Sequence, residues 1–393
     1  MMKADYIRNT VLPYGHHCID KSDVDEVVNV LYSDWITQGS KISEFEKRVA
    51  GYCNSRYAVV FSSGTAALHG AVNAANIRKG DEVVCTPMSF VASSNCVLYC
   101  DGVVRFADVK PGTFNIDPVE IRKNLSDKTR MIIPVDYAGQ PCDLDEIREL
   151  AVDNGLVVVE DASHSLGALY KGKPVGGLMD MTVFSFHPVK SITCGEGGMV
   201  LTNNEDFYES LLMFRSHGVT RDKQKLNGFD GDWFYEMQSL GFNYRITDFQ
   251  CALGISQFKK LDGFIKRRRS IVQRYNSVFK NIEGVIVPFE KSDVFSSYHL
   301  YVVHLDLDYF KSRSSVFNML RARRVGVQVH YIPIYHHPFY KKFLNIDYER
   351  FPVAESHYRT CLSLPLFPCM SGEDVDYVID TVVDVLDHCR RAG

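Results

Sequence analysis

Residues 143–161, DLDEIRELAVDNGLVVVED, contain a helical pattern followed directly by an apolar run. Leucine, isoleucine and alanine recur at helical spacing from Leu144 to Asn154, which predicts an amphipathic helix. Asp143 is placed to cap the start of this helix, with Glu146 three residues further on, and Gly155 can adopt the left-handed conformation that ends a helix. The apolar run that follows has the length and the branched side chains of a buried strand. A helix leading into such a strand is typical of an α/β fold.

Similar strands recur along the first half of the chain. They are short and β-branched or aromatic, with little polar alternation, as expected where helices cover both faces of a parallel sheet. We therefore expect α/β architecture with one open, mostly parallel sheet flanked by helices. The expected strands are Tyr57–Phe61, Val83–Thr86, Val103–Ala107, Met131–Val135, Leu156–Glu160, Thr182–Phe186 and Met199–Thr202.

The pattern changes after residue 262, where we place a domain boundary. Residues 1–262 are predicted to form a large domain with an N-terminal segment, and residues 263–393 a smaller C-terminal α+β domain. A helix is expected to join them rigidly, since no Pro/Gly-rich linker is present. The basic run Lys266–Arg269 on this helix is expected to form a solvated face. The elements expected in the smaller domain are helices at Phe264–Phe279, at Ser315–Arg324 and after Gly372, and strands at Tyr298–Leu307 and Gly326–Tyr331.

The composition is that of an ordinary globular protein. Of 393 residues, 46% are hydrophobic and 23% charged, and the net charge of −4 gives no electrostatic reason to expect nucleic acid or an anionic membrane as a partner. Eleven cysteines lack a metal-binding spacing, so we expect reduced thiols and no metal site. Residues 1–20 contain no apolar run that would form a secretory signal, and no stretch is long enough to span a bilayer. We expect a cytoplasmic protein without membrane segments.

Two segments follow strand ends and contain groups suited to binding an anion or a protonated nitrogen. Ser62–Leu68 has small residues where a strand ends and a helix begins, so backbone N–H groups and the hydroxyl of Thr65 would suit a phosphate; an ordinary Ser-capped helix has the same pattern. The strand at Leu156–Glu160 leads into Asp161, at the edge where α/β sheets bind ligands. A carboxylate there would hold a protonated ring nitrogen, or would cap a helix.

A third segment places Lys190 just beyond the strand that ends at Phe186. Lysine is rarely buried unless it is paired or functional, and desolvation together with a nearby cation would lower its pKa toward the neutral amine that attacks an aldehyde. A surface lysine is the alternative. The glycines of Gly195–Gly198 permit a tight return of the chain. Pyridoxal-phosphate (PLP) chemistry requires three groups: small residues that bind the phosphate, an acid for the ring nitrogen and a lysine for the aldehyde. Ser62–Leu68, Asp161 and Lys190 would supply them in this order along the chain.

These segments and several others resemble the DegT/DnrJ/EryC1/StrS sugar aminotransferase family, whose members have the PLP-dependent transferase fold type I. The resemblance extends over nearly the whole chain. Where relatives often have Ser-Ala-Thr, this chain has Ser63, Gly64 and Thr65, a small residue in place of another. The matching segments are Pro13–Gly15, Trp35–Gly39, Ser63–Ala66, Thr86–Phe90, Gly139–Asp143, Glu160–His164, Ser185–Lys190, Arg215–Gly218, Gly241–Asp248 and His330–Pro333.

The resemblance implies a role for each matching residue. Lys190 would be the catalytic Schiff-base lysine and proton shuttle, and Asp161 the partner of the pyridine nitrogen. The remaining cofactor-binding residues would be Thr65, Ala66 and Ser185 at the phosphate, Phe90 and His164 at the ring, and Asn243 from the neighbouring subunit of a homodimer. Substrate contacts are expected from Tyr14, Thr37, Gly39, His217, Arg245, His330 and Tyr331.

The implied reaction is a transamination. L-glutamate would donate the amino group, and the acceptor would be a UDP-linked keto-sugar, UDP-2-acetamido-2,6-dideoxy-β-L-arabino-hex-4-ulose. The product would be UDP-4-amino-4,6-dideoxy-N-acetyl-β-L-altrosamine, a precursor of pseudaminic acid. The alternatives are another NDP-4-keto-sugar aminotransferase of the family or a PLP-binding regulator without turnover. Lys190 argues against a PLP-dependent dehydratase, in which histidine replaces the lysine, and the absence of a Gly-x-Gly-x-x-Gly motif argues against a dehydrogenase.

Overall fold

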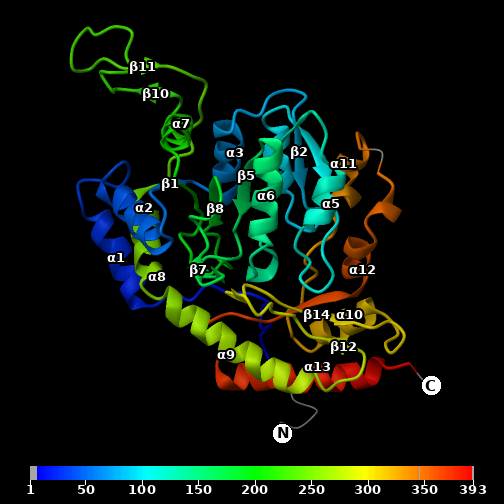
Figure 1. Ribbon diagram of the computed structural model, residues 1–393. Coiled ribbons are helices and arrows are strands. Elements are labelled where there is room, and N and C mark those ends of the chain that lie inside the picture. The colour runs from blue at the N-terminus through cyan, green and yellow to red at the C-terminus, as the bar shows by residue number, and fades with distance from the viewer. Residues whose placement is uncertain (1–6, 345, 392–393) are drawn as a thin grey trace.

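The computed structural model describes residues 7–344 and 346–391 and contains a mixed seven-stranded central sheet (Figure 1). The strand order is β1-β9-β8-β5-β4-β2-β3. The pairs β3–β2, β2–β4, β4–β5 and β5–β8 are parallel, whereas β9 runs antiparallel to both of its neighbours. The strands are β1 (Tyr57–Phe61), β2 (Glu82–Cys85), β3 (Val103–Phe106), β4 (Thr129–Ile133), β5 (Val157–Asp161), β8 (Met181–Ser185) and β9 (Gly198–Thr202). The expected α/β sheet is confirmed, and only the orientation of β9 departs from an all-parallel arrangement.

Helices cover both faces of this sheet because successive strand residues point to opposite sides. Val83 and Val159 pack on the face covered by α3 (Gly64–Ala74), α4 (Ala92–Leu98) and α7 (Glu205–Arg215). On the other face, Val84 and Val158 pack with α5 (Pro118–Lys123) and α6 (Leu144–Asn154), and Phe184 packs with α2 (Ser40–Tyr52) and α8 (Asp248–Phe258). Burial on both sides explains why these strands lack polar alternation. Helix α1 (Lys21–Leu31) lies against α8.

A second body lies below the carboxyl edge of the sheet, with α9 (Leu261–Phe279) and α13 (Gly372–Cys389) side by side at its base (Figure 1). These helices and α10 (Arg313–Ala322) pack against the antiparallel sheet β12-β14-β15, and Leu12 joins the same apolar cluster. The predicted boundary between residues 262 and 263 stays a prediction. The other elements are β12 (Val285–Ile286), β14 (Tyr301–Leu305), β15 (Cys361–Leu364), β6 (Leu169–Tyr170), β7 (Lys173–Pro174), β13 (Val294–Phe295), α11 (Pro338–Lys341), α12 (Pro352–Thr360) and the 3-10 turns Tyr137–Gly139, Ile334–His336 and Tyr348–Arg350.

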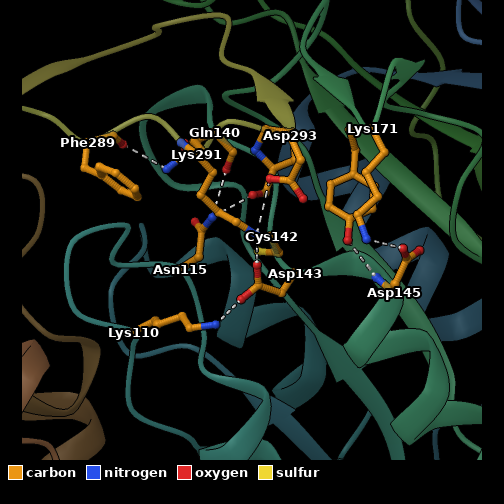
Figure 2. Close-up of polar contacts among 12 residues, drawn as sticks. Lys110, Asn115, Gln140, Cys142, Asp143, Asp145, Lys171, Phe289, Lys291 and Asp293 are labelled. Carbon is orange, nitrogen blue, oxygen red and sulfur yellow. Dashed lines mark hydrogen bonds and ion pairs between the residues drawn. The ribbon is translucent and has the colours of Figure 1, made fainter.

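Two local predictions are wrong. The segment Gly326–Tyr331 forms no strand, because its residues bond in turn to different partners: Gly326 donates to the carbonyl of Leu12, and Gln328 makes one isolated bridge with Ser363. The side chain of Asp143 makes no capping hydrogen bond to α6. Its carboxylate instead lies between the ammonium groups of Lys110 and Lys291 (Figure 2). Helix α6 itself begins and ends where expected, and Gly155 has φ of 62°.

The basic run on α9 is not a solvated face. Arg268 is only 1% exposed and donates from Nη1 to the carbonyl oxygens of His299 (3.2 Å) and Leu366 (2.8 Å). Arg267 donates to the carbonyl of Met370, and Arg269 forms an ion pair with Glu290 at 2.6 Å. The arginines therefore connect α9 to the segments around it, which periodicity alone did not reveal.

One pair of cysteines also departs from the expectation of reduced thiols. Cys18 and Cys369 are joined by a disulfide, with their Cα atoms 5.7 Å apart. The bond links the N-terminal segment to the segment between β15 and α13. The other nine cysteines are free thiols, eight of them buried.

Residues 219–240 leave the body of the molecule as a long arm with the short hairpin β10 (Val219–Thr220) and β11 (Glu236–Met237) at its base (Figure 1). Several of its apolar side chains are exposed; Trp233, for example, is 70% exposed and Leu240 73%. Within the described residues, no helix is both long enough and apolar enough to cross a membrane.

Candidate active site

The carboxyl ends of β5 and β8 bring two chemical groups to the same edge of the sheet. These strands are parallel neighbours, and Asp161 pairs with Val183 in their register. Asp161 is the last residue of β5, and Lys190 lies in the turn five residues beyond the end of β8. The two side chains interact electrostatically, because the Asp161 carboxylate raises the pKa of Lys190. The pairing of parallel strand ends thus produces the expected acid–amine pair.

Asp161 is 3% exposed and accepts hydrogen bonds at both carboxylate oxygens. Oδ2 accepts from the Oγ of Ser93 at 2.6 Å, and Ser93 is itself 2.8 Å from the Oγ of Ser89. Oδ1 accepts from the Oγ of Ser163 at 2.6 Å and from its backbone N–H at 3.2 Å. These donors fix the orientation of the carboxylate.

Lys190 lies in a short turn whose backbone is closed by hydrogen bonds. Its N–H donates to the carbonyl of His187 (2.9 Å), and the N–H of Cys194 donates to that of Phe186 (3.0 Å). The chain returns into β9 through Gly195, which has φ of 79°. Desolvation lowers the pKa of Lys190 to about 8, against the opposing effect of Asp161. The expected lowering is therefore present, and burial is its cause, whereas no cation among the described residues contributes to it.

Three buried histidines interact electrostatically with Lys190, and burial holds all three neutral. Burial lowers the pKa of His330 to about 3 and the pKa values of His164 and His299 well below their usual range, and the ammonium of Lys190 adds to each shift. The rings of His164 and His299 lie 4.3 Å apart, and the Nε2 of His164 is 3.1 Å from the hydroxyl of Tyr331. The Nδ1 atoms of His164 and His299 have no hydrogen-bond partner among the described residues.

The start of α3 forms a cradle of small groups beside β8. The Oγ of Ser63 accepts from the N–H of Ala66 at 3.1 Å, which caps the helix. A Cβ at Gly64 would lie 3.0 Å from the Cβ and Oγ of Ser185, so Ser185 closes one side of the cradle. First-turn N–H groups have no partner within a helix, and the helix dipole favours a negative charge there. The first turn of α3 and Ser185 therefore lie side by side, and the small residues and N–H groups of that turn would suit a phosphate.

The remaining predicted residues fall into two groups. Tyr14 belongs to the Lys190 side: its ring is 5.1 Å from that of His330, and its hydroxyl adds to the effect of burial in raising the pKa of Tyr331. The second group lies along the segment that precedes α8. Thr37 bridges to Thr247, and Gly39 donates to the carboxylate of Asp248 at 2.8 Å. This group comprises Thr37, Gly39, His217, Asn243 and Arg245; Asn243 and His217 are exposed and adjoin one another through the Ser216–Asn243 bridge.

Phe90 is 62% exposed. It follows Ser89, whose hydroxyl is hydrogen-bonded to that of Ser93, the donor to Asp161. An aromatic ring held open beside the Asp161 pocket is consistent with the expected stacking role. The sequence did not reveal Ser93 or His299 as site residues. Ser89 and Ser93 are four residues apart around the start of α4, which is a detectable signal, whereas His299 lies in the predicted strand Tyr298–Leu307, where no local feature marks it as a site residue. Among the described residues, no group of three histidine, cysteine or acidic side chains is arranged to hold a metal.

A lysine with a lowered pKa, a hydrogen-bonded aspartate and an anion cradle on one sheet edge form the arrangement expected of an enzyme that uses PLP. The model of the DegT/DnrJ/EryC1/StrS aminotransferase family matches residues 17–383. The chain belongs to this family. It is therefore an aminotransferase, and its fold is that of the family's solved structures.

Relatives of known name cover almost the whole chain. A UDP-4-amino-4,6-dideoxy-N-acetyl-β-L-altrosamine transaminase of Campylobacter jejuni is 36% identical over 384 residues, which are 97% of this chain and 99% of the relative. The structure of Helicobacter pylori PseC, an aminotransferase involved in pseudaminic acid biosynthesis, has a TM-score of 0.90 at 32% identity and covers 96% of this chain and 100% of that one. A Streptococcus pneumoniae protein described as a sugar aminotransferase, in its PLP form, has a TM-score of 0.90 at 29% identity and covers 96% and 99%.

Proposed function

We propose that this aminotransferase uses PLP to move the amino group of L-glutamate to the C4 ketone of a UDP-linked 4-keto-6-deoxy-N-acetylhexosamine. The acceptor would be UDP-2-acetamido-2,6-dideoxy-β-L-arabino-hex-4-ulose, and the product UDP-4-amino-4,6-dideoxy-N-acetyl-β-L-altrosamine. The observation that carries the proposal is the pairing of Lys190, whose amine has a pKa of about 8, with Asp161 at the adjacent strand end. The C. jejuni relative supports the choice of sugar.

The residues of the site fit the cofactor at each of its parts. The cradle of Thr65, Ala66 and Ser185 would hold the phosphate, and its width depends on the missing side chain of Gly64. Asp161 would hold a proton on the pyridine nitrogen, since its oxygens are fixed by serine donors. Phe90 would lie against one ring face. The S. pneumoniae structure, solved in its PLP form, supports this assignment.

When bound, PLP supplies an electron sink for the carbanion formed at the reacting carbon. The protein supplies the proton transfers. Lys190, once free of the cofactor, would take the α-proton of glutamate and later deliver a proton to C4 of the sugar. With a pKa of about 8, roughly one amine in ten is already neutral at pH 7, compared with fewer than one in a thousand for an ordinary lysine. His164 and Tyr331 form a neutral pair beside this amine.

Substrate contacts are proposed from both residue groups of the site. Tyr14, His330 and Tyr331 lie on the Lys190 side of the same chain. Asn243, with Thr37, Gly39, His217 and Arg245, is proposed to act on the site of a second subunit. The exposure of Asn243 and of the apolar arm at residues 219–240 supports this arrangement, in which a homodimer would be the working enzyme.

Absorbance spectroscopy of the purified protein tests the cofactor and the lysine. We expect the PLP-loaded protein to be yellow and to lose this colour when L-glutamate is added, with 2-oxoglutarate released. Lys190→Ala should fail to hold PLP covalently after borohydride reduction, whereas Lys173→Ala, which removes an exposed lysine on β7, should behave as the wild type. A colourless wild type after incubation with PLP refutes the proposal.

Product analysis tests the sugar. The enzyme is first treated with L-glutamate and then mixed with candidate UDP- and GDP-linked 4-keto-sugars. The amino sugar is identified by mass spectrometry and NMR. We expect turnover of the UDP-linked β-L-arabino ketone. Turnover of a different NDP-4-keto-sugar alone would support another aminotransferase of the family, and release of 2-oxoglutarate without any sugar product would leave the regulator as the better description.

A further inference from the structure

A cavity of about 490 Å³ lies apart from the Lys190 site, between the large body and the second body. One wall comes from Phe114, Tyr137 and Gln140 of the large body, and the other from the segment 286–308 and from α12. Its volume falls within the range of small-molecule sites, which concentrate between domains and combine apolar walls with a few polar groups. None of the residues assigned above to PLP or to the sugar lines it.

The walls of this cavity are fixed by polar contacts (Figure 2). The side chain of Gln140 donates to the carbonyl of Phe289 at 3.2 Å and accepts from the N–H of Lys291 at 2.9 Å. The ammonium of Lys291 is in turn paired with Asp143, which also binds Lys110. The segment from the second body is therefore attached to the large body, and the space between them is a property of the fold.

Two buried histidines, His304 and His357, belong to the lining, and their tautomers follow from their hydrogen bonds. The Nε2 of His357 lies 2.9 Å from the carbonyl oxygen of His330 and 3.2 Å from the Tyr137 hydroxyl, which itself donates to the same carbonyl. Since a carbonyl only accepts, this Nε2 carries the proton. Burial lowers the pKa of His357 to about 4, so its ring is neutral and its Nδ1 is an acceptor.

The same reasoning extends to His304. Its Nε2 lies 2.9 Å from the Nδ1 of His357 and must therefore carry a proton. Because burial lowers the pKa of His304 to about 3, the ring is neutral and its Nδ1 is an unprotonated acceptor. Within residues 7–344 and 346–391, no protein group donates to this Nδ1, and His304 lines the cavity. An occupant of the cavity would meet a hydrogen-bond acceptor there.

The charges of the lining disfavour anions. It contains three carboxylates, of Glu290, Asp306 and Asp308, and of these Glu290 is paired with Arg269. Arg359 is the one guanidinium among the described lining residues, and both histidines are neutral. An anion would therefore meet more carboxylates than cations, with Arg359 as its one cationic partner among the described lining residues.

We propose that this cavity is a second binding site, for an uncharged molecule with an aromatic or aliphatic body that donates an N–H or O–H to the Nδ1 of His304. Its floor is also the rear wall of the candidate active site, because Tyr137, Leu300 and Val302 pack with Tyr14 and Tyr331. A molecule bound there contacts the groups that hold the His330 carbonyl, one residue from Tyr331.

Indole is a suitable probe, because it has an apolar body, one N–H and no amine that an aldehyde cofactor would capture. Its affinity for the PLP-loaded protein is measured by calorimetry without substrates, so the result is independent of the reaction at Lys190. We expect binding of indole, and roughly tenfold weaker binding of 1-methylindole and of indole-3-carboxylate, since the first cannot donate and the second is an anion. No binding of indole at millimolar concentration, or equal affinity for indole and 1-methylindole, overturns the proposal.

Substitutions locate the site. His304→Phe should abolish the preference for indole over 1-methylindole, and His304→Gln, which retains an acceptor, should preserve it. His388→Phe, at an exposed histidine of α13, is the matched control and should leave the preference unchanged. If His304→Phe does not fold, as judged by circular dichroism, Val302→Phe replaces it and should weaken indole binding by filling the cavity. Unchanged indole binding in Val302→Phe, or an unchanged preference in folded His304→Phe, refutes the proposal.

Discussion

Replacing Gly198 with alanine should distort the start of α3, which forms the anion cradle. Gly198 is the first residue of β9, and a Cβ there would lie 2.6 Å from the carbonyl carbon of Ser63 and 2.7 Å from the Cα of Gly64, with the Ser63 carbonyl oxygen closer still. All three atoms are backbone, so no side chain can rotate away. The new methyl group must displace the residue that caps α3 or move β9 out of the sheet.

The magnitude follows from known costs of overpacking. One methyl group inserted into a packed interior costs about 1–3 kcal/mol. Loss of the Ser63 cap on the N–H of Ala66 would add about 1 kcal/mol. If about one-third of this strain, roughly 0.7–1.3 kcal/mol, falls on the cradle, the dissociation constant for PLP should rise about three- to ninefold, since 1.4 kcal/mol corresponds to a factor of ten.

Urea denaturation of the PLP-free protein measures the loss of stability, and absorbance titration measures the affinity for PLP. Gly51→Ala is the matched control, because a Cβ at Gly51 in α2 meets nothing within 4 Å and alanine is the better helix residue. We expect lower stability and weaker PLP binding for Gly198→Ala, and neither loss for Gly51→Ala. If the two variants behave alike, the close approach of β9 to the cradle does not shape the site.

Three further predictions concern charge. Arg268→Met should lower the free energy of unfolding, measured with urea, by about 2–4 kcal/mol because two buried carbonyls lose their donor. Arg274→Met, on the same helix, breaks a surface ion pair and should change it by less than about 0.5 kcal/mol. Equal effects would contradict the buried role of Arg268. The rate of PLP capture should fall about tenfold per pH unit below pH 8 and level off above it. Asp161→Asn should shift the midpoint of this profile to lower pH, because the carboxylate raises the Lys190 pKa. Stopped-flow absorbance measures the rate, and an unshifted midpoint would mean that the two groups do not interact. As pH falls from 6.5 toward 3, His304 of the unfolded chain binds a proton that the folded protein excludes, so the free energy of unfolding should fall by up to about 1.4 kcal/mol per pH unit. In His304→Phe, urea denaturation should show a shallower dependence of this free energy on pH. An unchanged dependence would mean that His304 is not held neutral.

The sequence predicted the sheet well because its strands are buried on both faces. A strand such as β5, with Val158 and Val159 on opposite sides, must be apolar throughout, and this pattern can be recognised without knowledge of its neighbours. Helix α6 was equally accessible, since Gly155 ends it by a local backbone conformation. The acid–amine pair was predictable for a similar reason, because Asp161 and Lys190 both follow strand ends that a parallel sheet places together.

What sequence reasoning missed depends on partners distant in the chain. Asp143 looks like a helix cap, but Lys291, 148 positions away, takes its carboxylate. Arg268 looks solvated until the carbonyls of His299 and Leu366 are brought to it. The disulfide of Cys18 and Cys369 spans 351 positions. In each case the partner is distant in the chain, so local periodicity contains no information about it. The contact formed in the folded protein decides the role of the side chain.

The contribution of Leu12 to the second body has a consequence for folding during synthesis. Leu12 bridges to Val325 and packs among residues that extend to Cys389 near the end of the chain. Roughly 300 residues must be made before Val325 can meet Leu12, which takes on the order of 15–60 s at ordinary rates of translation. By the end of that interval all seven strands of the central sheet, the last of which ends at Thr202, have been made, whereas Leu12 still lacks its contact with Val325. Fusion of a folded tag close to residue 7 should therefore slow the last step of folding more than the first.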